Sequence, residues 1–140
     1  MRRMIFLNLP VTDLQRATAF YEALGFKRND QMCSDDGSAL TWSDAINIML
    51  LKHEIFAQFT PKQIGDVRTT STALISLSTD DREDVDKIAA TAVELGGRAD
   101  VGGIHEEDFM YARDFEDPDG NGFGILWIAP VVTDPAIAEP

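Results

Sequence analysis

The sequence predicts an α+β fold of two βαβββ modules, at about residues 1–66 and 67–133, forming one cupped mixed sheet with its helices outside. The first observation is that a strand, a helix and three further strands follow one another twice, with starts about 70 residues apart. The second is that each half contains one amphipathic helix pattern that ends at glycine. One helix covers only one face of a sheet, so the two halves are expected to enclose a central cavity.

The first module begins with a strand and a helix. Side chains alternate over residues 5–11, as in a strand with one buried face. Thr12 or Asp13 is expected to cap a helix near 13–24, and Gly25 ends it. The three further strand candidates of this module are residues 27–34, 39–44 and 46–53, and residues 54–66 form a short helix or a lid-like loop.

The second module repeats this order. Residues 72–79 read as a strand, and Asp80 or Asp81 is expected to cap a helix near 81–95 that ends at Gly96. Its three further strand candidates are residues 98–103, 109–117 and 122–130. Residues 134–140 carry two prolines and no periodicity, so they are expected to form a tail after a single domain of residues 1–133.

Composition narrows the functional classes. The net charge of −12 opposes binding to nucleic-acid backbones and anionic membranes. Cys33 is the only cysteine, so no internal disulfide forms, and no apolar run approaches a membrane span. The first residues read as a strand rather than a signal peptide, which predicts a cytoplasmic protein.

Alternation along the strands predicts which side chains face the cavity. They are Phe6, Asn8, Leu74, Ser76, Gly124 and Leu126. Gly124 stands out within the apolar run "GFGILWI", because glycine weakens a strand and has no side chain to pack there.

Two motifs at opposite ends of the chain resemble one known family. "LPVTDLQRATAFYEALGF" resembles the opening signature of the vicinal oxygen chelate superfamily, and "FEDPDGNGFGILW" resembles its closing signature. This superfamily includes glyoxalase I, extradiol dioxygenases, and the bleomycin- and fosfomycin-resistance proteins. The resemblance spans nearly the whole chain, and it implies the glyoxalase/bleomycin resistance fold and a homodimer.

The resemblance also implies positions for a divalent metal, normally held by two histidines and two glutamates. The histidine positions fall on Phe6 and about Leu74, and the glutamate positions on Met49 (less certainly Asn47) and Gly124. None of these residues has the usual donor atoms of a metal ligand. The sequence therefore predicts that the usual metal site is absent and that no cofactor is bound.

Other candidate residues each have two interpretations. His53 and His105, with neighbouring acidic residues, either form a displaced metal site or, as we favour, are solvated loop residues. Tyr111 and Arg113 share a strand face, where they either bind a ligand or make a structural salt bridge. Trp42, with Phe6, Met49 and Leu126, either lines an apolar ligand pocket or fills the core.

Two functional hypotheses remain. The first is a metal-free binding protein that holds a small apolar or aromatic molecule, as resistance-type relatives do. The second is a glyoxalase-type lyase or dioxygenase with an atypical metal site. The missing ligands favour the first, with Phe6, Asn8, Trp42, Met49, Leu74, Ser76, Tyr111, Arg113, Gly124 and Leu126 as expected contacts.

Overall fold

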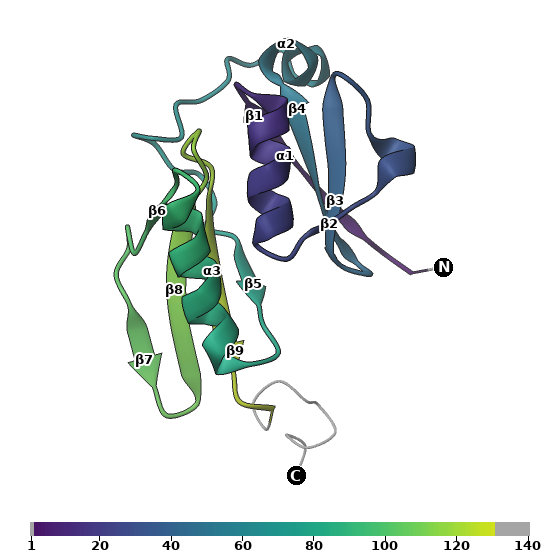
Figure 1. The fold of residues 1–140 in the computed structure, drawn as a ribbon. Coiled ribbons are helices and arrows are strands. Elements are labelled where there is room, and N and C mark those ends of the chain that lie inside the picture. Colours follow the sequence, from purple (N-terminus) through teal and green to yellow (C-terminus); the bar gives the residue numbers. More distant parts are fainter. Residues whose placement is uncertain (1, 131–140) are drawn as a thin grey trace. The chain divides into compact units, whose positions relative to one another are not determined.

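The computed structural model describes residues 2–130, and the chain divides into two compact units, Met1–Thr70 (unit 1) and Ser71–Pro140 (unit 2). Figure 1 shows one helix lying along the sheet of each unit. The predicted tail at 134–140 lies outside the described residues. The boundary at residue 70 lies close to the predicted module boundary, whereas the prediction that both modules act as a single domain stays a prediction.

Unit 1 has the predicted βαβββ order. Its sheet has the strand order β1-β4-β3-β2, in which β1 is parallel to β4 and the other pairs are antiparallel. The elements of the sheet and its helix are β1 (Ile5–Val11), α1 (Leu14–Ala23), β2 (Lys27–Arg28), β3 (Gly37–Ser43) and β4 (Ile46–Lys52). The short helices are η1 (Asp30–Met32), α2 (His53–Phe56) and η2 (Ala57–Phe59).

Unit 2 repeats the topology and adds one strand. Its sheet has the order β5-β9-β8-β6, again with the first strand parallel to the last, and the additional β7 pairs with β8. The elements are β5 (Ser76–Ser78), α3 (Arg82–Glu94), β6 (Arg98–Ala99), β7 (His105–Glu107), β8 (Met110–Glu116) and β9 (Gly122–Ile128). The predicted α+β class and the two βαβββ modules are confirmed, and the strands form two sheets, one in each unit.

Both helices begin and end where the sequence predicts, within one residue or two, although the Asp81 side chain makes no capping hydrogen bond at the start of α3. The Asp13 carboxylate caps α1 by accepting a hydrogen bond from the Arg16 backbone N–H (3.1 Å). At the other end, the Phe26 N–H donates to the Tyr21 carbonyl (3.1 Å), and Gly25 takes a φ of 112°. This Schellman motif needs a left-handed residue, which glycine supplies without strain. The Gly97 N–H closes α3 in the same way, donating to the Ala92 carbonyl (2.8 Å).

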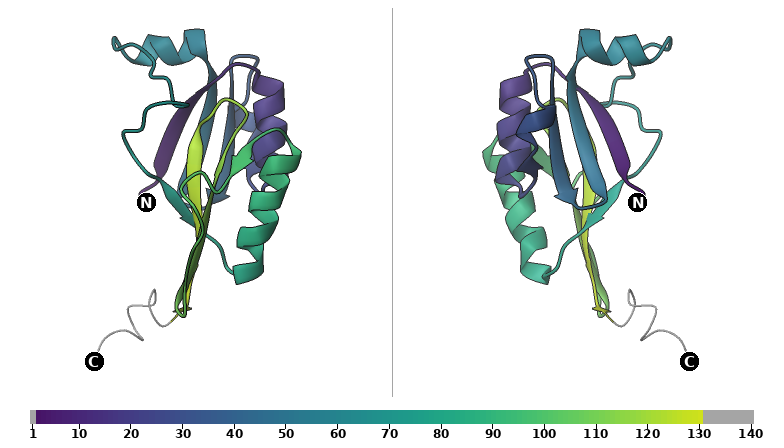
Figure 2. Two further views of the ribbon diagram at one scale, coloured as in Figure 1. Left: turned by 90° about the vertical axis from the view of Figure 1, so that its left-hand side faces the viewer. Right: turned by 90° about the vertical axis from the view of Figure 1, so that its right-hand side faces the viewer.

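Each helix packs on one face of its own sheet. In unit 1, Tyr21 of α1, Leu40 of β3 and Ile48 of β4 are fully buried, and Leu40 lies opposite Ile48 in the ladder. In unit 2, α3 buries Val85 and packs on β8 and β9, where Ile125 is also buried. Figure 2 shows α1 and α3 each on a single side of its own sheet. The opposite side is called the far face of each sheet below, and no helix of this kind lies along it in the part of the chain that the structure describes.

Four sequence predictions of local structure are corrected. The strand predicted at 72–79 is only Ser76–Ser78, because its parallel pairing with β9 begins at Ser76, opposite Gly124. The strand predicted at 27–34 stops at Arg28, where the Asn29 side chain accepts a hydrogen bond from the Gln31 N–H (3.2 Å) and starts η1. The strand at 98–103 stops at Ala99. His105, expected in a loop, lies in β7.

Among the described residues, no helix is long and apolar enough to cross a membrane.

Candidate functional site on the far faces of the two sheets

Phe6, Asn8 and Met49 share the far face of the unit 1 sheet. In the ladder Asn8 lies opposite Met49, and Phe6 lies opposite Asn47. The other face belongs to α1, since Thr18 of the helix donates to Ser38 of β3 through the two hydroxyls (2.8 Å). The Phe6 side chain is 46% exposed, a large fraction for an aromatic ring. The far face of unit 1 therefore presents an accessible aromatic side chain.

Trp42 is not on this face. Its ring lies 5.0 Å from the ring of Phe26, which in turn contacts Tyr21 at 5.3 Å on the α1 side of the sheet. A register shift between Thr41 and Ser43 makes Trp42 the extra residue of a bulge. The structure thus separates Trp42 from Met49 and places it in the aromatic core of unit 1, as the core-packing interpretation expected.

Ser76, Gly124 and Leu126 share the far face of the unit 2 sheet. Ser76 lies opposite Gly124, and Leu126 lies opposite Ser78 on one side and Ala112 on the other. The Gly124 N–H donates to the Ile75 carbonyl (2.8 Å), so β9 and the start of β5 are held closely together.

The close approach of Ser76 gives a structural reason for glycine at position 124. A Cβ atom on residue 124 would lie 2.5 Å from the Ser76 Oγ and 3.3 Å from the Ser76 Cβ. The first distance is far below van der Waals contact, so any larger residue at 124 requires the serine side chain to move. The space at 124 is consequently shaped by the hydroxyl of the neighbouring strand, and is not simply vacant.

Leu74 is not a strand residue. It precedes β5, and its side chain is 93% exposed. Pairing between β5 and β9 begins only at Ser76. The alternation of side chains along a strand therefore does not show that Leu74 faces the same side of the sheet as Ser76. This placement removes Leu74 from the set of residues that the far-face ladder positions.

The residues at the family's metal positions do not fit a divalent metal ion. Phe6 and Leu74 have no donor atom, Gly124 has no side chain, and the Met49 thioether is a soft ligand. Asn47 is buried, and its amide nitrogen donates to the Ile5 carbonyl (3.2 Å). Over residues 2–130, no three His, Cys, Asp or Glu side chains are gathered in a way that suits a metal ion.

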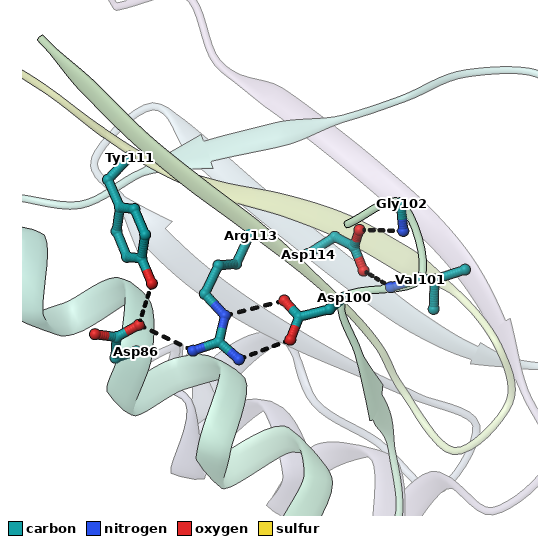
Figure 3. A network of polar contacts seen from close by, with 7 residues as sticks. All are labelled: Asp86, Asp100, Val101, Gly102, Tyr111, Arg113 and Asp114. Carbon is teal, nitrogen blue, oxygen red and sulfur yellow. Dashed lines mark hydrogen bonds and ion pairs between the residues drawn. The ribbon is translucent and has the colours of Figure 1, made fainter. Parts of the chain in front are cut away.

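Tyr111 and Arg113 point to the α3 side of the sheet, opposite to Gly124. Figure 3 shows the Arg113 guanidinium between two carboxylates. Its Nε and Nη2 donate to the two oxygens of Asp100 (2.9 and 2.7 Å), and its Nη1 donates to Asp86 of α3 (2.9 Å). The Tyr111 hydroxyl donates to the same Asp86 oxygen (2.6 Å). The structural salt-bridge interpretation describes this geometry, and the ligand-contact interpretation does not.

These contacts shift the acidity of all four side chains. The hydrogen bond from Tyr111, followed by that from Arg113, lowers the pKa of Asp86 below its ordinary 3.8. The hydrogen bonds from Arg113 likewise lower the pKa of Asp100. The Asp86 carboxylate raises the pKa of Tyr111 above 10.0, and Asp100 chiefly raises the pKa of Arg113. The shifts of Asp86, Asp100 and Arg113 favour the ion pairs seen in the structure, and the shift of Tyr111 favours the neutral hydroxyl that donates to Asp86.

The neighbouring residue Asp114 secures the same loop from the far face. Its two carboxylate oxygens accept hydrogen bonds from the backbone N–H groups of Val101 (2.8 Å) and Gly102 (2.7 Å), as Figure 3 shows. Arg113 and Asp114 therefore hold the residues after β6 from opposite sides of β8. This arrangement stabilises Asp100, whose φ of 58° is unusual for a residue other than glycine.

Within residues 2–130, neither histidine belongs to a group of three His, Cys, Asp or Glu side chains that could hold a metal ion. His53 is exposed and begins α2. The His105 Nε2 atom lies 3.2 Å from the Gly102 carbonyl oxygen. Glu106, a predicted partner of His105 in a displaced site, instead pairs with Arg82, whose guanidinium also lies 4.3 Å from the centre of the Tyr111 ring.

The acidic turn of the closing motif is used for folding. Asp117 is 2% exposed, and its Oδ1 accepts from the N–H groups of Asp119 (2.8 Å) and Asn121 (3.0 Å). Its Oδ2 accepts from the Asn121 side-chain amide (3.0 Å). The motif thus fixes the tight connection between β8 and β9 and sets their register.

The paired βαβββ units and the motifs that build them define a class of two-module α+β proteins. The family model of the Glyoxalase/Bleomycin resistance protein/Dioxygenase superfamily matches residues 3–125. The chain belongs to this superfamily. A comparison with curated proteins found no match.

Solved structures share the fold at low sequence identity. The hypothetical protein SA1046 from S. aureus is 27% identical, with a TM-score of 0.74 over 91% of this chain and 95% of its own. A glyoxalase/bleomycin resistance protein/dioxygenase family enzyme from Burkholderia phytofirmans PsJN is 23% identical, with a TM-score of 0.71 over 91% and 99%. TnmS3, described as an antibiotic binding protein from Streptomyces sp. CB03234, is 24% identical, with a TM-score of 0.60 over 92% and 98%.

Three acidic residues escaped the sequence analysis. Asp86, Asp100 and Asp114 hold the β8 network together, but they lie on a helix, after a strand and within a strand. Their spacing in the sequence follows no regular period. Only the "DVGG" stretch after β6, rich in turn residues, hinted that Asp100 has a special backbone conformation.

Proposed function

We propose that this protein binds a small apolar or aromatic molecule at the far faces of its sheets without the metal ion usual in its superfamily. The observation that carries the proposal is the residue set Phe6, Met49, Leu74 and Gly124 at the expected metal positions. Small-molecule sites are mostly apolar with a few placed hydrogen-bonding groups. Each far face holds such a mixture: Phe6 and Met49 share theirs with Asn8 in unit 1, and Leu126 shares its own with Ser76 in unit 2.

The geometry supports only part of the predicted contact set. Phe6, Asn8 and Met49 share one face of unit 1, and Ser76, Gly124 and Leu126 share one face of unit 2. Trp42, Tyr111 and Arg113 belong to the opposite faces, so we leave them out of the proposed contacts. Leu74 stays a candidate only through its exposure. TnmS3 adds support for the class of function, since it is described as an antibiotic binding protein.

The test is a thermal-shift screen of aromatic small molecules, followed by titration of any hit against two variants. A ligand that binds the folded protein raises its melting temperature by an amount that grows with the logarithm of ligand concentration above the dissociation constant. Phe6→Ser removes a half-exposed ring from the proposed site and should weaken the hit by about tenfold or more. Val93→Ser removes a side chain that is 54% exposed on α3, the helix on the opposite side of the unit 2 sheet from its far face, and should leave affinity unchanged. Equal effects of both variants would refute the placement of the site.

Metal content and turnover test the competing hypothesis. We expect less than one tenth of a metal ion per chain, by elemental analysis, for each of zinc, nickel, iron and manganese. Near-stoichiometric metal that is lost when residues 6 and 49 are changed would overturn the metal-free proposal. Turnover of hemithioacetals or catechols would establish the lyase or dioxygenase alternative.

We further propose that the protein is a homodimer, as the family resemblance implies. The exposed apolar side chains Met4 and Ile5, at the start of the edge strand β1, are consistent with a partner surface. Light scattering at tens of micromolar should give twice the chain mass of 15.5 kDa. The monomer mass at that concentration would refute the proposal. The cytoplasmic location stays a prediction.

A further inference from the structure

We infer that the Ser76 hydroxyl is the hydrogen-bonding group that unit 2 offers to a ligand, in the space which a side chain at position 124 would otherwise fill. The inference rests on the proposed function and deepens it, because it names the polar contact and the chemistry of its partner. In this view Ser76 and Gly124 form one subsite built from two strands.

The first step is steric. The Ser76 Oγ lies 2.5 Å from the place of a Cβ on residue 124, so it stands above the glycine rather than beside it. Ser76 and Gly124 are directly paired in the parallel ladder. Their side-chain positions therefore project from the same face at neighbouring points. The Ser76 hydroxyl of β5 is therefore the polar group nearest to position 124 of β9, where glycine has no side chain.

The second step concerns availability. Ser76 is exposed, and within residues 2–130 its hydroxyl makes no hydrogen bond to another group. The nearby Asp114, paired with Gly124 from the other side, already uses both oxygens to hold the backbone of Val101 and Gly102. Of the polar side chains in this row, the hydroxyl of Ser76 is thus the one left to bind a ligand.

The third step is the chemical class of the ligand group. A serine hydroxyl is neutral and can both donate and accept a hydrogen bond. The adjacent Asp114 carboxylate and a chain charge of −12 disfavour an anionic group. The expected partner is a neutral hydroxyl, carbonyl or amide on an otherwise apolar or aromatic molecule.

The experiment uses two probes of similar size, phenol and fluorobenzene, titrated into ¹⁵N-labelled full-length protein. Phenol carries a hydroxyl, and fluorobenzene lacks a strong hydrogen-bonding group. Both should shift the amide signals of residues 76 and 124. The measured quantity is the phenol-to-fluorobenzene ratio of dissociation constants, compared between wild type, Ser76→Ala and Ser43→Ala. Ser76→Ala keeps the Cβ and removes only the hydroxyl, and Ser43→Ala removes an exposed strand hydroxyl in unit 1.

We expect the ratio to rise about three- to tenfold in Ser76→Ala, the loss of one hydrogen bond, and to stay constant in Ser43→Ala. If both probes bind but Ser76→Ala leaves the ratio unchanged, the inference is overturned while the proposed small-molecule binding stands. If the probes instead shift the amide signals of other far-face residues and not those of residues 76 and 124, the inference is likewise overturned and the proposed small-molecule binding stands. If neither probe binds at the far faces, both the inference and the proposed function fail.

Discussion

Replacing Arg113 by Met tests the β8 network, because Met keeps an apolar stem and removes the guanidinium. Arg113 makes two hydrogen bonds to Asp100 and one to Asp86. The side chains of Arg113 and Asp100 are 20% and 27% exposed, whereas Asp86 is 59% exposed. The bidentate Asp100 contact should contribute about 1–2 kcal/mol to stability. The Asp86 contact is close to a surface pair, worth about 0–1 kcal/mol. The expected loss at pH 7 is therefore about 1–3 kcal/mol.

The loss should depend on pH in a defined direction. Arg113 lowers the pKa of Asp86 and of Asp100 in the folded protein. A carboxyl with a depressed folded pKa stabilises the protein above its unfolded pKa, and this contribution is lost as the pH falls through the folded value. The difference between wild type and Arg113→Met should accordingly be constant near neutrality. It should shrink progressively below about pH 4.

Urea denaturation followed by tryptophan fluorescence can isolate unit 2. The chain has two tryptophans, Trp42 in unit 1 and Trp127 in unit 2, so the experiment is done in a Trp42→Phe background. The matched control is Lys87→Met, which likewise removes a positive charge from unit 2, at an exposed position of α3, and should change stability by less than about 0.5 kcal/mol. Equal stabilities of wild type and Arg113→Met at pH 7, or a loss that persists in full at pH 2, would refute the reasoning.

Three further predictions concern residues of unit 2. Gly124→Ala should cost about 1 kcal/mol, because its new Cβ meets the Ser76 side chain, and most of this cost should vanish in a Ser76→Gly background; a purely additive double variant in urea titrations would contradict it. Asp117→Ala should cost about 2–4 kcal/mol, because it leaves the N–H groups of the β8–β9 turn without their acceptor; a melting temperature equal to that of wild type would argue against this role. Tyr111→Phe should lower the free energy of unfolding below pH 10 and lower it less above pH 10. The hydrogen bond to Asp86 raises the pKa of Tyr111, so its stabilising contribution is present below the unfolded pKa and is lost as the pH rises through the folded pKa. An equal loss of stability at pH 7 and pH 11 would exclude this reasoning.

The sequence alone determined the two-module fold and the ends of its helices. These features depend on local signals, namely strand alternation, helical spacing, the cap at Asp13 and the glycine at position 25, and local signals survive in a single sequence. The closing motif likewise predicted the turn that Asp117 builds. The resemblance carried by the two motifs agrees with the family match over residues 3–125.

Tertiary structure decided which side chains share a face and why Gly124 is a glycine. Trp42 packs on Phe26 at the α1 side, and the late start of β5 leaves Leu74 exposed, because each outcome depends on contacts with another part of the chain. Arg113 turned to Asp86 and Asp100, which lie 27 and 13 residues away in the chain. Ser76 and Gly124 are 48 residues apart in the chain, and the parallel ladder pairs them directly. A Cβ on residue 124 would therefore lie 2.5 Å from the Ser76 Oγ and clash with it. Contacts of this kind have no sequence period, so only the folded chain could reveal them.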